Sequence, residues 1–193
     1  GGPDVALAEA IRAAHVSVDM ALYELNLWTV RDALLDAQAR GLTVRIVAET
    51  GALDSPEMQA LAAAGIPIRP DDLSGLMHDK FAILDRSEVW TGSMNYTLSG
   101  AYHQDNNLLR IRDEKLAADY LTEFEEMFTQ GKFGPGSPPT PPTLPSPWLA
   151  CPWRCIFRPT TAWPATSCPC CAPPWRVSPC SPSRSPPTIW PRP

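Results

Sequence analysis

The chain has 193 residues and a formal net charge of −5, and its charges are concentrated in one region. Residues 1–133 hold all 21 acidic residues and 11 of the 16 Lys and Arg, which gives this region a formal charge of −10. This balance disfavours a surface built for nucleic acid, which usually needs basic side chains to displace counterions. The sequence also has no apolar run of about 20 residues, the length that predicts a transmembrane helix.

Residues 134–193 differ sharply in composition from the rest of the chain. They hold 19 of the 23 prolines, all six cysteines and five of the seven tryptophans, but no Asp, Glu or Lys. Proline at this density removes backbone donors and blocks helices and strands. We therefore expect a domain over 1–133 and a disordered or out-of-frame tail over 134–193.

Three interpretations of this tail are open: a Pro-rich linker, a metal-binding segment around the cysteines at 168–171, and a shifted reading frame. Disordered linkers are usually poor in Trp and Cys, and no partner motif stands at zinc-finger spacing from the cysteines. GC-rich codons read in a shifted frame tend to yield Pro, Arg, Ser, Cys, Trp and Ala. We therefore expect the natural protein to continue past about Gly136 in another frame. Because the chain begins with Gly1 and not with Met, we also expect its start to lie upstream.

Hydrophobic periodicity predicts the elements of the first region in chain order. We expect helices over 4–13, 29–40 and 55–64, and strands over 15–23, 42–48, 66–69, 79–85, 88–91 and 107–111. A last helix follows Asp113. Ser55 and Asp113 are the expected N-caps of their helices. This order predicts an α/β fold in which helices sandwich a mixed β-sheet.

The stretch 76–112 contains side chains suited to chemistry on an anion. On a strand, residues two apart point to the same side, so His78 and Lys80 are expected to share a face. In such a pair the lysine attracts a phosphate and the histidine acts as a nucleophile. A His beside a Lys is more often an ordinary surface pair, so this pair alone decides little. Strand parity places Asp85 on the opposite face, which predicts a structural role for its carboxylate.

A second polar group follows in Gly92, Ser93 and Asn95. Glycine allows a close backbone approach, and the hydroxyl and the amide offer neutral hydrogen bonds to phosphate oxygens. A Gly-Ser pair by itself usually indicates only a turn. Tyr23 and Glu24 end the first predicted strand, and they either line the mouth of this site or cap the sheet edge.

Together these residues fill one spaced pattern, His-x-Lys-x4-Asp-x6-Gly-Ser-x-Asn. Its fixed positions are His78, Lys80, Asp85, Gly92, Ser93 and Asn95. The pattern, and the order of elements over 4–130, resemble one repeat of the phospholipase D superfamily. The resemblance implies a phospholipase D-like fold and the hydrolysis of phosphodiesters through a phosphohistidine intermediate, without a metal or another cofactor.

The resemblance also implies roles for single residues. His78 is the nucleophile or the acid and base, and Lys80 and Asn95 hold the non-bridging phosphate oxygens, where positioned charge stabilises the transition state. Ser93 binds the same oxygens or orients His78. Asp85 and Gly92 are expected to be structural parts of the motif.

One position departs from the family pattern. Many nuclease-like members carry a Glu just before the strand that follows the Gly-Ser-x-Asn turn, and this Glu orients the histidine. The corresponding position here is Asn106, which accepts a hydrogen bond but adds no charge, so either Asp105 substitutes or the charged form of His78 is less stabilised. His15 is expected to be structural, and His103 is expected to be a solvent-facing loop residue.

The chemistry needs two histidines that start in opposite protonation states, whereas this chain carries one copy of the motif. The partner is therefore a second motif-bearing half, either a tandem repeat lost here, which we prefer, or a homodimer partner. The substrate, a phospholipid or DNA or RNA, stays open, as does the localisation. The alternative function is a non-catalytic phospholipase D-like dimerisation or binding domain.

Overall fold

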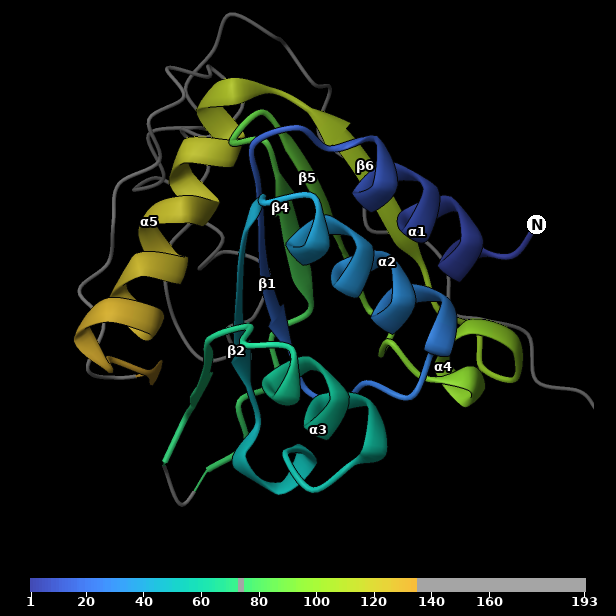
Figure 1. The fold of residues 1–193 in the computed structure, drawn as a ribbon, viewed down its shortest axis with the longest axis horizontal. Coiled ribbons are helices and arrows are strands. Elements are labelled where there is room, and N and C mark those ends of the chain that lie inside the picture. Colours follow the sequence, from blue (N-terminus) through green and yellow to red (C-terminus); the bar gives the residue numbers. More distant parts are fainter. Residues whose placement is uncertain (73–74, 135–193) are drawn as a thin grey trace, which may run out of the picture. The chain divides into compact units, whose positions relative to one another are not determined.

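The computed structural model describes residues 1–72 and 75–134, and Figure 1 shows their fold. The expected tail over 134–193 lies outside the described residues, apart from Gly134 itself, and so do the cysteines at 168–171. The boundary of the domain at 133 stays a prediction. Among the described residues, no helix is long and apolar enough to cross a membrane.

A six-stranded mixed sheet forms the centre of the described region, in the order β3-β2-β1-β4-β5-β6. Its strands are β1 (Ser17–Leu22), β2 (Thr43–Ala48), β3 (Ile68–Pro70), β4 (Phe81–Leu84), β5 (Glu88–Gly92) and β6 (Leu108–Arg112). β1 runs parallel to β2, and β2 to β3, whereas the pairs β1–β4, β4–β5 and β5–β6 are antiparallel. The predicted strands are all present, so the expected mixed sheet is confirmed.

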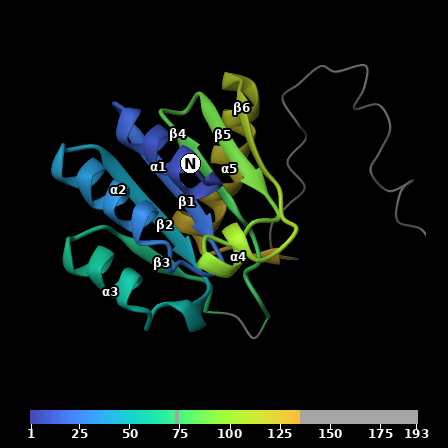
Figure 2. The same cartoon turned by 90° about the vertical axis from the view of Figure 1, so that its right-hand side faces the viewer.

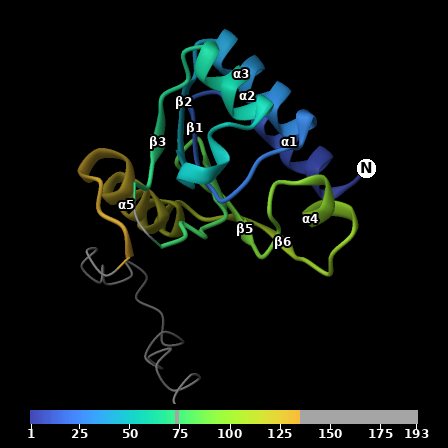
Figure 3. The same ribbon diagram turned by 90° about the horizontal axis from the view of Figure 1, so that it is seen from below.

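Helices cover both faces of this sheet. They are α1 (Pro3–Ala13), α2 (Trp28–Ala39), α3 (Pro56–Ala63), the short α4 (Leu98–Tyr102) and α5 (Glu114–Gln130), with a 3-10 turn η1 (Thr50–Ala52). Figure 3 shows α1, α2 and α3 together on one face and α5 on the opposite face. The helices α4 and η1 were not predicted, because segments of five and three residues are too short to establish a period.

Each face of the sheet has its own apolar core. Ala82 and Leu84 of β4 pack with the cluster under α1, α2 and α3, whereas Phe81 and Ile83 pack with the cluster under α5. This division follows from the pleat, because successive side chains of a strand point to opposite faces. β1 lies in the middle of the sheet, and all six of its residues are buried.

An ion-pair network fastens α5 to the centre of the sheet. Asp19 of β1 is fully buried, and Arg45 of β2 donates from Nε to its Oδ1 at 2.6 Å. The same guanidinium contacts Glu125 of α5 at 2.8 Å and lies over the rings of Phe124 and Phe128. Burial is the largest influence on Asp19 and raises the pKa of its carboxyl, against the opposing effect of Arg45. A buried charge of this kind is tolerated because it is paired.

Two of the helices begin at the predicted capping residues. The hydroxyl of Ser55 accepts the backbone N–H of Met58 at 3.3 Å. The carboxylate of Asp113 accepts the N–H groups of Lys115 and Leu116, both at 2.9 Å. Each side chain satisfies donors that the first turn of a helix leaves without partners, so both predicted N-caps are confirmed.

Candidate active site

The motif residues gather at one end of the sheet because the ends of four neighbouring antiparallel strands meet there. Ala21 pairs with Phe81, Phe81 pairs with Thr91, and Gly92 pairs with Leu108. The end of β1, the start of β4, the end of β5 and the start of β6 are therefore neighbours. Figure 2 shows α4 beside the end of β5 at this end of the sheet.

His78 and Lys80 both contact the ring of Tyr23, the residue that follows β1. The ring centroids of Tyr23 and His78 lie 4.9 Å apart in an edge-on arrangement, and Lys80 Nζ lies 5.5 Å from the Tyr23 centroid. Lys80 Nζ also donates to the backbone carbonyl of His78 at 2.7 Å. These contacts place the imidazole and the ammonium group beside the same aromatic ring at the end of β1.

The predicted strand at 79–85 begins later than expected, and this changes the reason for the pairing of His78 with Lys80. β4 starts at Phe81, so both residues precede the strand. The alternation of a pleated strand therefore does not place them, and their shared contact with Tyr23 does. Sequence reasoning left the role of Tyr23 open, because its contact with His78 depends on the pairing of β1 with β4.

The ammonium group of Lys80 lies in a partly desolvated setting. The residue is only 8% exposed. Burial lowers the pKa of Lys80 below its ordinary value, while the carboxylates of Asp79 and Glu24 act in the opposite direction. A charge in such surroundings acts more strongly on a nearby anion than a charge in bulk water.

The turn after β5 is held by a compact set of hydrogen bonds. Ser93 Oγ donates to Oδ1 of Asn106 at 3.0 Å and accepts the backbone N–H of Asn107 at 3.1 Å. Asn106 Nδ2 in turn donates to the carbonyl of Gly100 in α4 at 2.9 Å. A side chain at Gly92 would clash with the backbone carbonyl of Asn107. This crowding explains why glycine stands at that position.

Asn95 lies two residues beyond Ser93 in the same turn. Its Oδ1 is buried, yet within residues 1–72 and 75–134 it makes no hydrogen bond. Buried amide oxygens are usually paired, so this one calls for a functional explanation. The turn that carries Asn95 starts beside Lys80, whose backbone carbonyl accepts a hydrogen bond from Thr91 Oγ1 at 3.2 Å.

A cavity of about 440 Å³ reaches His78 and Lys80 from the side of α5. Asp79, Asp119 and Glu123 contribute carboxylates to its wall, and Ser93, Asn95 and Asn106 are not among its lining residues. Burial, and then the charge of Asp79, raise the pKa of Glu123. Such a wall repels a phosphate group. Of the expected phosphate-binding set, His78 and Lys80 line this acidic cavity and Asn95 does not, so the cavity is not the place where all three would bind one phosphate.

Asp85 lies at the opposite end of β4 from His78 and Lys80. Its carboxylate accepts the backbone N–H groups of His15, Val16 and Ser17 at 2.7–3.1 Å. Burial opposes its negative charge, but these backbone donors outweigh burial and lower the pKa of Asp85. The carboxylate therefore joins the turn after β4 to the start of β1.

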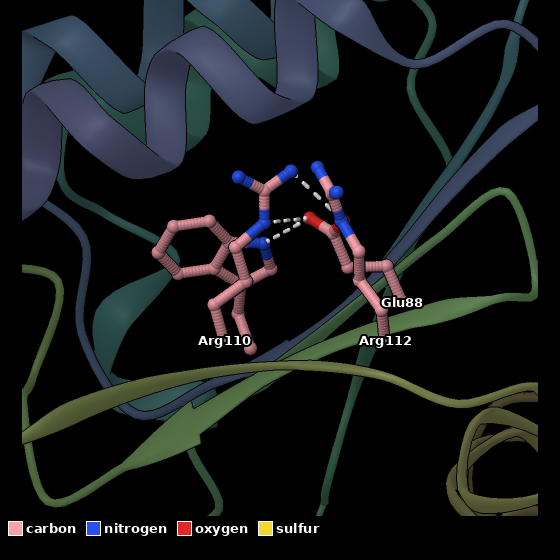
Figure 4. A network of polar contacts seen from close by, with 4 residues as sticks. Glu88, Arg110 and Arg112 are labelled. Carbon is pink, nitrogen blue, oxygen red and sulfur yellow. Dashed lines mark hydrogen bonds and ion pairs between the residues drawn. The ribbon is translucent and has the colours of Figure 1, made fainter.

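Arg110 and Arg112, which follow the motif in sequence, lie away from its histidine. Arg110 donates to both carboxylate oxygens of Glu88, each at 2.9 Å, and Arg112 donates to Oε2 at 2.9 Å (Figure 4). Trp90 Nε1 adds a hydrogen bond to Oε1 at 2.7 Å. Glu88 pairs with Arg112 at the end of the β5–β6 ladder remote from Gly92. This network is thus remote from the motif turn.

The other two histidines lie elsewhere in the described region. His15 is exposed and contributes its backbone N–H to Asp85. His103 is exposed and follows α4, where a loop was expected. No group of three or more His, Cys, Asp or Glu side chains in the described residues is arranged to hold a metal ion.

Comparison with known proteins places this domain in a family. A family model described as "Cardiolipin synthase, PLD-like domain" matches residues 7–128. The mitochondrial cardiolipin hydrolase of Homo sapiens is 33% identical over 126 residues, which cover 64% of this chain and 50% of that protein. The phospholipase D of Rickettsia prowazekii (strain Madrid E) is 33% identical over 117 residues, which cover 60% of this chain and 57% of that protein. The chain thus spans about half the length of these curated relatives.

Solved structures agree with this assignment. Nuc from Salmonella typhimurium, described as a phospholipase D family member, superimposes with a TM-score of 0.60 and 30% identity, covering 65% of this chain and 86% of that one. NucT from Helicobacter pylori shares the fold, with a TM-score of 0.56 and 19% identity over 64% of this chain and 86% of that one. Because the matched family model extends over residues 7–128 and includes His78, Lys80 and Asn95, the chain belongs to the phospholipase D superfamily, in the family of cardiolipin synthase-type PLD-like domains.

Proposed function

We propose that this chain is one catalytic half of a phosphodiesterase that works by phospholipase D-type chemistry. The observation that carries the proposal is the arrangement of His78 and Lys80 around Tyr23, next to the turn that holds Asn95. The arrangement lies inside the span that the family model matches. Family membership supports the type of chemistry, and the contacts with Tyr23 support the choice of His78 and Lys80.

The reaction has two steps in this proposal. An imidazole nitrogen of His78 attacks phosphorus, and the bond to the leaving alcohol oxygen breaks while a second histidine donates a proton to that oxygen. Water, deprotonated by the second histidine, then attacks phosphorus, and the bond to His78 breaks to release the product. Lys80 and Asn95 stabilise the charge on the non-bridging oxygens as it develops.

Ser93 and Asn106 serve this site as orienting residues. The Ser93 hydroxyl donates a hydrogen bond to Asn106 Oδ1, and its oxygen accepts one from the backbone N–H of Asn107. These contacts favour orientation of the turn over direct binding of phosphate by Ser93. Asp85 and Gly92 act through the backbone, because Asp85 binds amide groups at and just before the start of β1 and Gly92 allows a close approach of Asn107.

The second histidine comes from another motif-bearing half. His15 and His103 are exposed residues whose described contacts do not reach His78. A tandem repeat in the natural protein or a homodimer partner would each supply the missing group. In both cases the isolated monomer is expected to be nearly inactive.

A phospholipid suits the described region better than a nucleic acid. The first 133 residues carry a formal charge of −10, and Arg110 and Arg112 are bound to Glu88 at the far end of β5. Nucleic-acid binding would need such basic groups to be close to the reacting phosphate. Hydrolysis of phosphatidylcholine vesicles and of a single-stranded DNA, measured side by side, tests this preference.

Trapping of the covalent intermediate tests the reaction itself. The full chain is mixed with a phosphodiester substrate, quenched rapidly, and searched by mass spectrometry for a phosphorylated histidine at position 78. The adduct should form in wild type and in His103→Ala, a matched change of an exposed histidine, and should be absent from His78→Ala. An adduct at another residue, or hydrolysis that persists in His78→Ala, would contradict the proposal and favour the non-catalytic alternative.

A further inference from the structure

The ring of Tyr23 is the common contact of the histidine and the lysine of the motif. The His78 ring meets it edge-on, with an interplanar angle of 71° and a centroid distance of 4.9 Å. Lys80 Nζ lies 5.5 Å from its centroid. Aromatic pairs prefer this edge-on geometry, and a cation is attracted to the face of an aromatic ring. One side chain therefore holds both partners.

The position of this ring follows from strand pairing. Tyr23 comes directly after β1, Lys80 comes directly before β4, and His78 lies three residues before β4. β1 and β4 run antiparallel, with Ala21 opposite Phe81. The residue after one strand end must therefore lie beside the residues that precede the other. The pairing of β1 with β4 therefore brings Tyr23 close to both residues.

The hydrogen bond from Lys80 Nζ to the carbonyl of His78 closes the arrangement. It limits where the ammonium group can move, and the ring limits where the imidazole can turn. His78 precedes the first residue of β4, so the ladder hydrogen bonds of the strand do not hold it. A nucleophile on such a segment needs an outside contact to keep its orientation.

We propose that Tyr23 is a positioning residue that keeps the His78 imidazole and the Lys80 ammonium group in one arrangement for attack on phosphorus. This role rests on the proposed function of the site. Both contacts are made by the aromatic ring and neither by the phenolic hydroxyl, so the ring alone is required. The inference thus separates Tyr23→Phe, which keeps the ring, from Tyr23→Leu, which removes it.

The first test observes position without requiring activity. The full chain contains three histidines, so their ring signals are assigned by NMR from single His→Ala variants. A neighbouring aromatic ring shifts the His78 signals, and Tyr23→Phe is expected to retain that shift. Tyr23→Leu and Tyr23→Met are expected to lose it, while the signals of His103 stay in place. Unchanged His78 signals in both ring-deleted variants would overturn the proposal.

The second test measures turnover on a phosphodiester substrate. Misplacement of a reacting group by about 1 Å can cost on the order of 100-fold in rate, so kcat should fall about 10- to 100-fold in Tyr23→Leu. KM should change much less, and Tyr23→Phe should stay within about twofold of wild type. A loss of rate in Tyr23→Phe equal to that in Tyr23→Leu would contradict a role for the ring alone.

Controls separate this proposal from a general loss of folding and from failure of the proposed function. Trp28→Leu removes an exposed aromatic ring from the start of α2 and should leave the His78 signals and kcat unchanged. Thermal unfolding shows whether Tyr23→Leu folds; Tyr23→Met keeps more of the apolar volume if it does not. If a wild-type sample in which two motif-bearing halves are assembled fails to hydrolyse any phosphodiester, the proposed function fails, and the NMR comparison still decides the position of His78.

Discussion

Asp85 Oδ1 accepts the backbone N–H of Val16 at 2.7 Å, which ties the turn after β4 to the residue just before β1. The same carboxylate also binds the N–H groups of His15 and Ser17. Asp85 has a left-handed backbone, with φ of 52°. The motif aspartate therefore works at the end of β4 that lies away from His78, and its contacts are with backbone amides.

Asp85→Asn should reduce stability and leave the chemistry unchanged. Asparagine tolerates a left-handed backbone, so the change removes charge without adding strain. Hydrogen bonds to a charged group contribute roughly 1.5–3 kcal/mol, so the free energy of unfolding should fall by about that amount. Denaturant titration measures it, and kcat measured well below the unfolding midpoint should match wild type. A large fall in kcat for a folded variant would mean that Asp85 takes part in catalysis.

Glu88→Gln should weaken the pairing of β5 with β6 without affecting the active site. Burial is the largest single influence on Glu88, but the hydrogen bonds from Arg110, Arg112 and Trp90 together outweigh it and lower the pKa of its carboxyl. Arg112 is 71% exposed, so the expected loss is about 1–2 kcal/mol of unfolding free energy. Chemical denaturation at neutral pH checks this value.

The pH dependence of that loss has a definite sign. A carboxyl with a lowered pKa in the folded state stabilises the protein above its ordinary pKa of 4.5, and the contribution disappears as pH falls through the folded value. The difference between wild type and Glu88→Gln should therefore be full at pH 7 and shrink below pH 4.5. A difference that grows on acidification would show that Glu88 is not held as the charged partner of the two arginines.

Lys80 should set the alkaline limit of activity. Burial lowers the pKa of Lys80, against the opposing charges of Asp79 and Glu24, so its ammonium group is lost at a pH below the ordinary 10.5. The value of kcat/KM should fall as pH rises through that lowered pKa, because the neutral amine no longer attracts phosphate. Lys80→Arg keeps a positive charge at all these pH values. Any activity that this variant retains should therefore show no such fall in kcat/KM at alkaline pH. The same alkaline fall in kcat/KM in Lys80→Arg would show that another group causes it.

The contribution of Lys80 to stability should rise with pH, whereas its contribution to kcat/KM should fall. In the range between the lowered folded pKa and 10.5, the unfolded chain binds more protons than the folded chain. The free energy of unfolding therefore gains a contribution that rises with pH in that range. Denaturant titrations of wild type and of Lys80→Met across this range isolate the contribution. A contribution that falls with pH would contradict a lowered pKa.

Asn95→Asp should reduce turnover strongly while retaining the shape of the side chain. The variant places a carboxylate where the amide is proposed to meet phosphate oxygens, and loss of one such donor costs about 100- to 1,000-fold in kcat. Steady-state kinetics on the best phosphodiester substrate measures the effect, with thermal unfolding as the check on folding. A rate within a few-fold of wild type would remove Asn95 from the proposed phosphate-binding group.

Gly92→Ala should disturb the turn that carries Ser93 and Asn95. The added methyl group would clash with the backbone carbonyl of Asn107, and forced overpacking costs about 1–3 kcal/mol. Gly51→Ala is the matched control, because a methyl group at that position meets no other atom within 4 Å. The free energy of unfolding and kcat should both fall in Gly92→Ala and stay unchanged in Gly51→Ala. Equal behaviour of the two variants would show that the turn relaxes freely.

Local patterns in the sequence determined the elements and the family of this domain. Apolar spacing predicted all six strands, and Ser55 and Asp113 marked the starts of two helices, because period and capping depend on neighbouring residues only. The spacing from His78 to Asn95 indicated the phospholipase D superfamily for a similar reason, since it is a property of a single segment. The boundary of β4 was less accurate, because strand ends depend on hydrogen bonds with other strands.

The contacts of the candidate site were decided by the tertiary structure. Tyr23 meets His78 and Lys80 only because β4 pairs with β1, and residues so far apart in sequence share no local pattern. The bond from Ser93 to Asn106 likewise requires the start of β6 to lie beside the end of β5. Strand order is set by which faces bury apolar surface together. For this reason the sequence alone predicted the candidate reactive residues, whereas only the tertiary structure determined which side chains surround them.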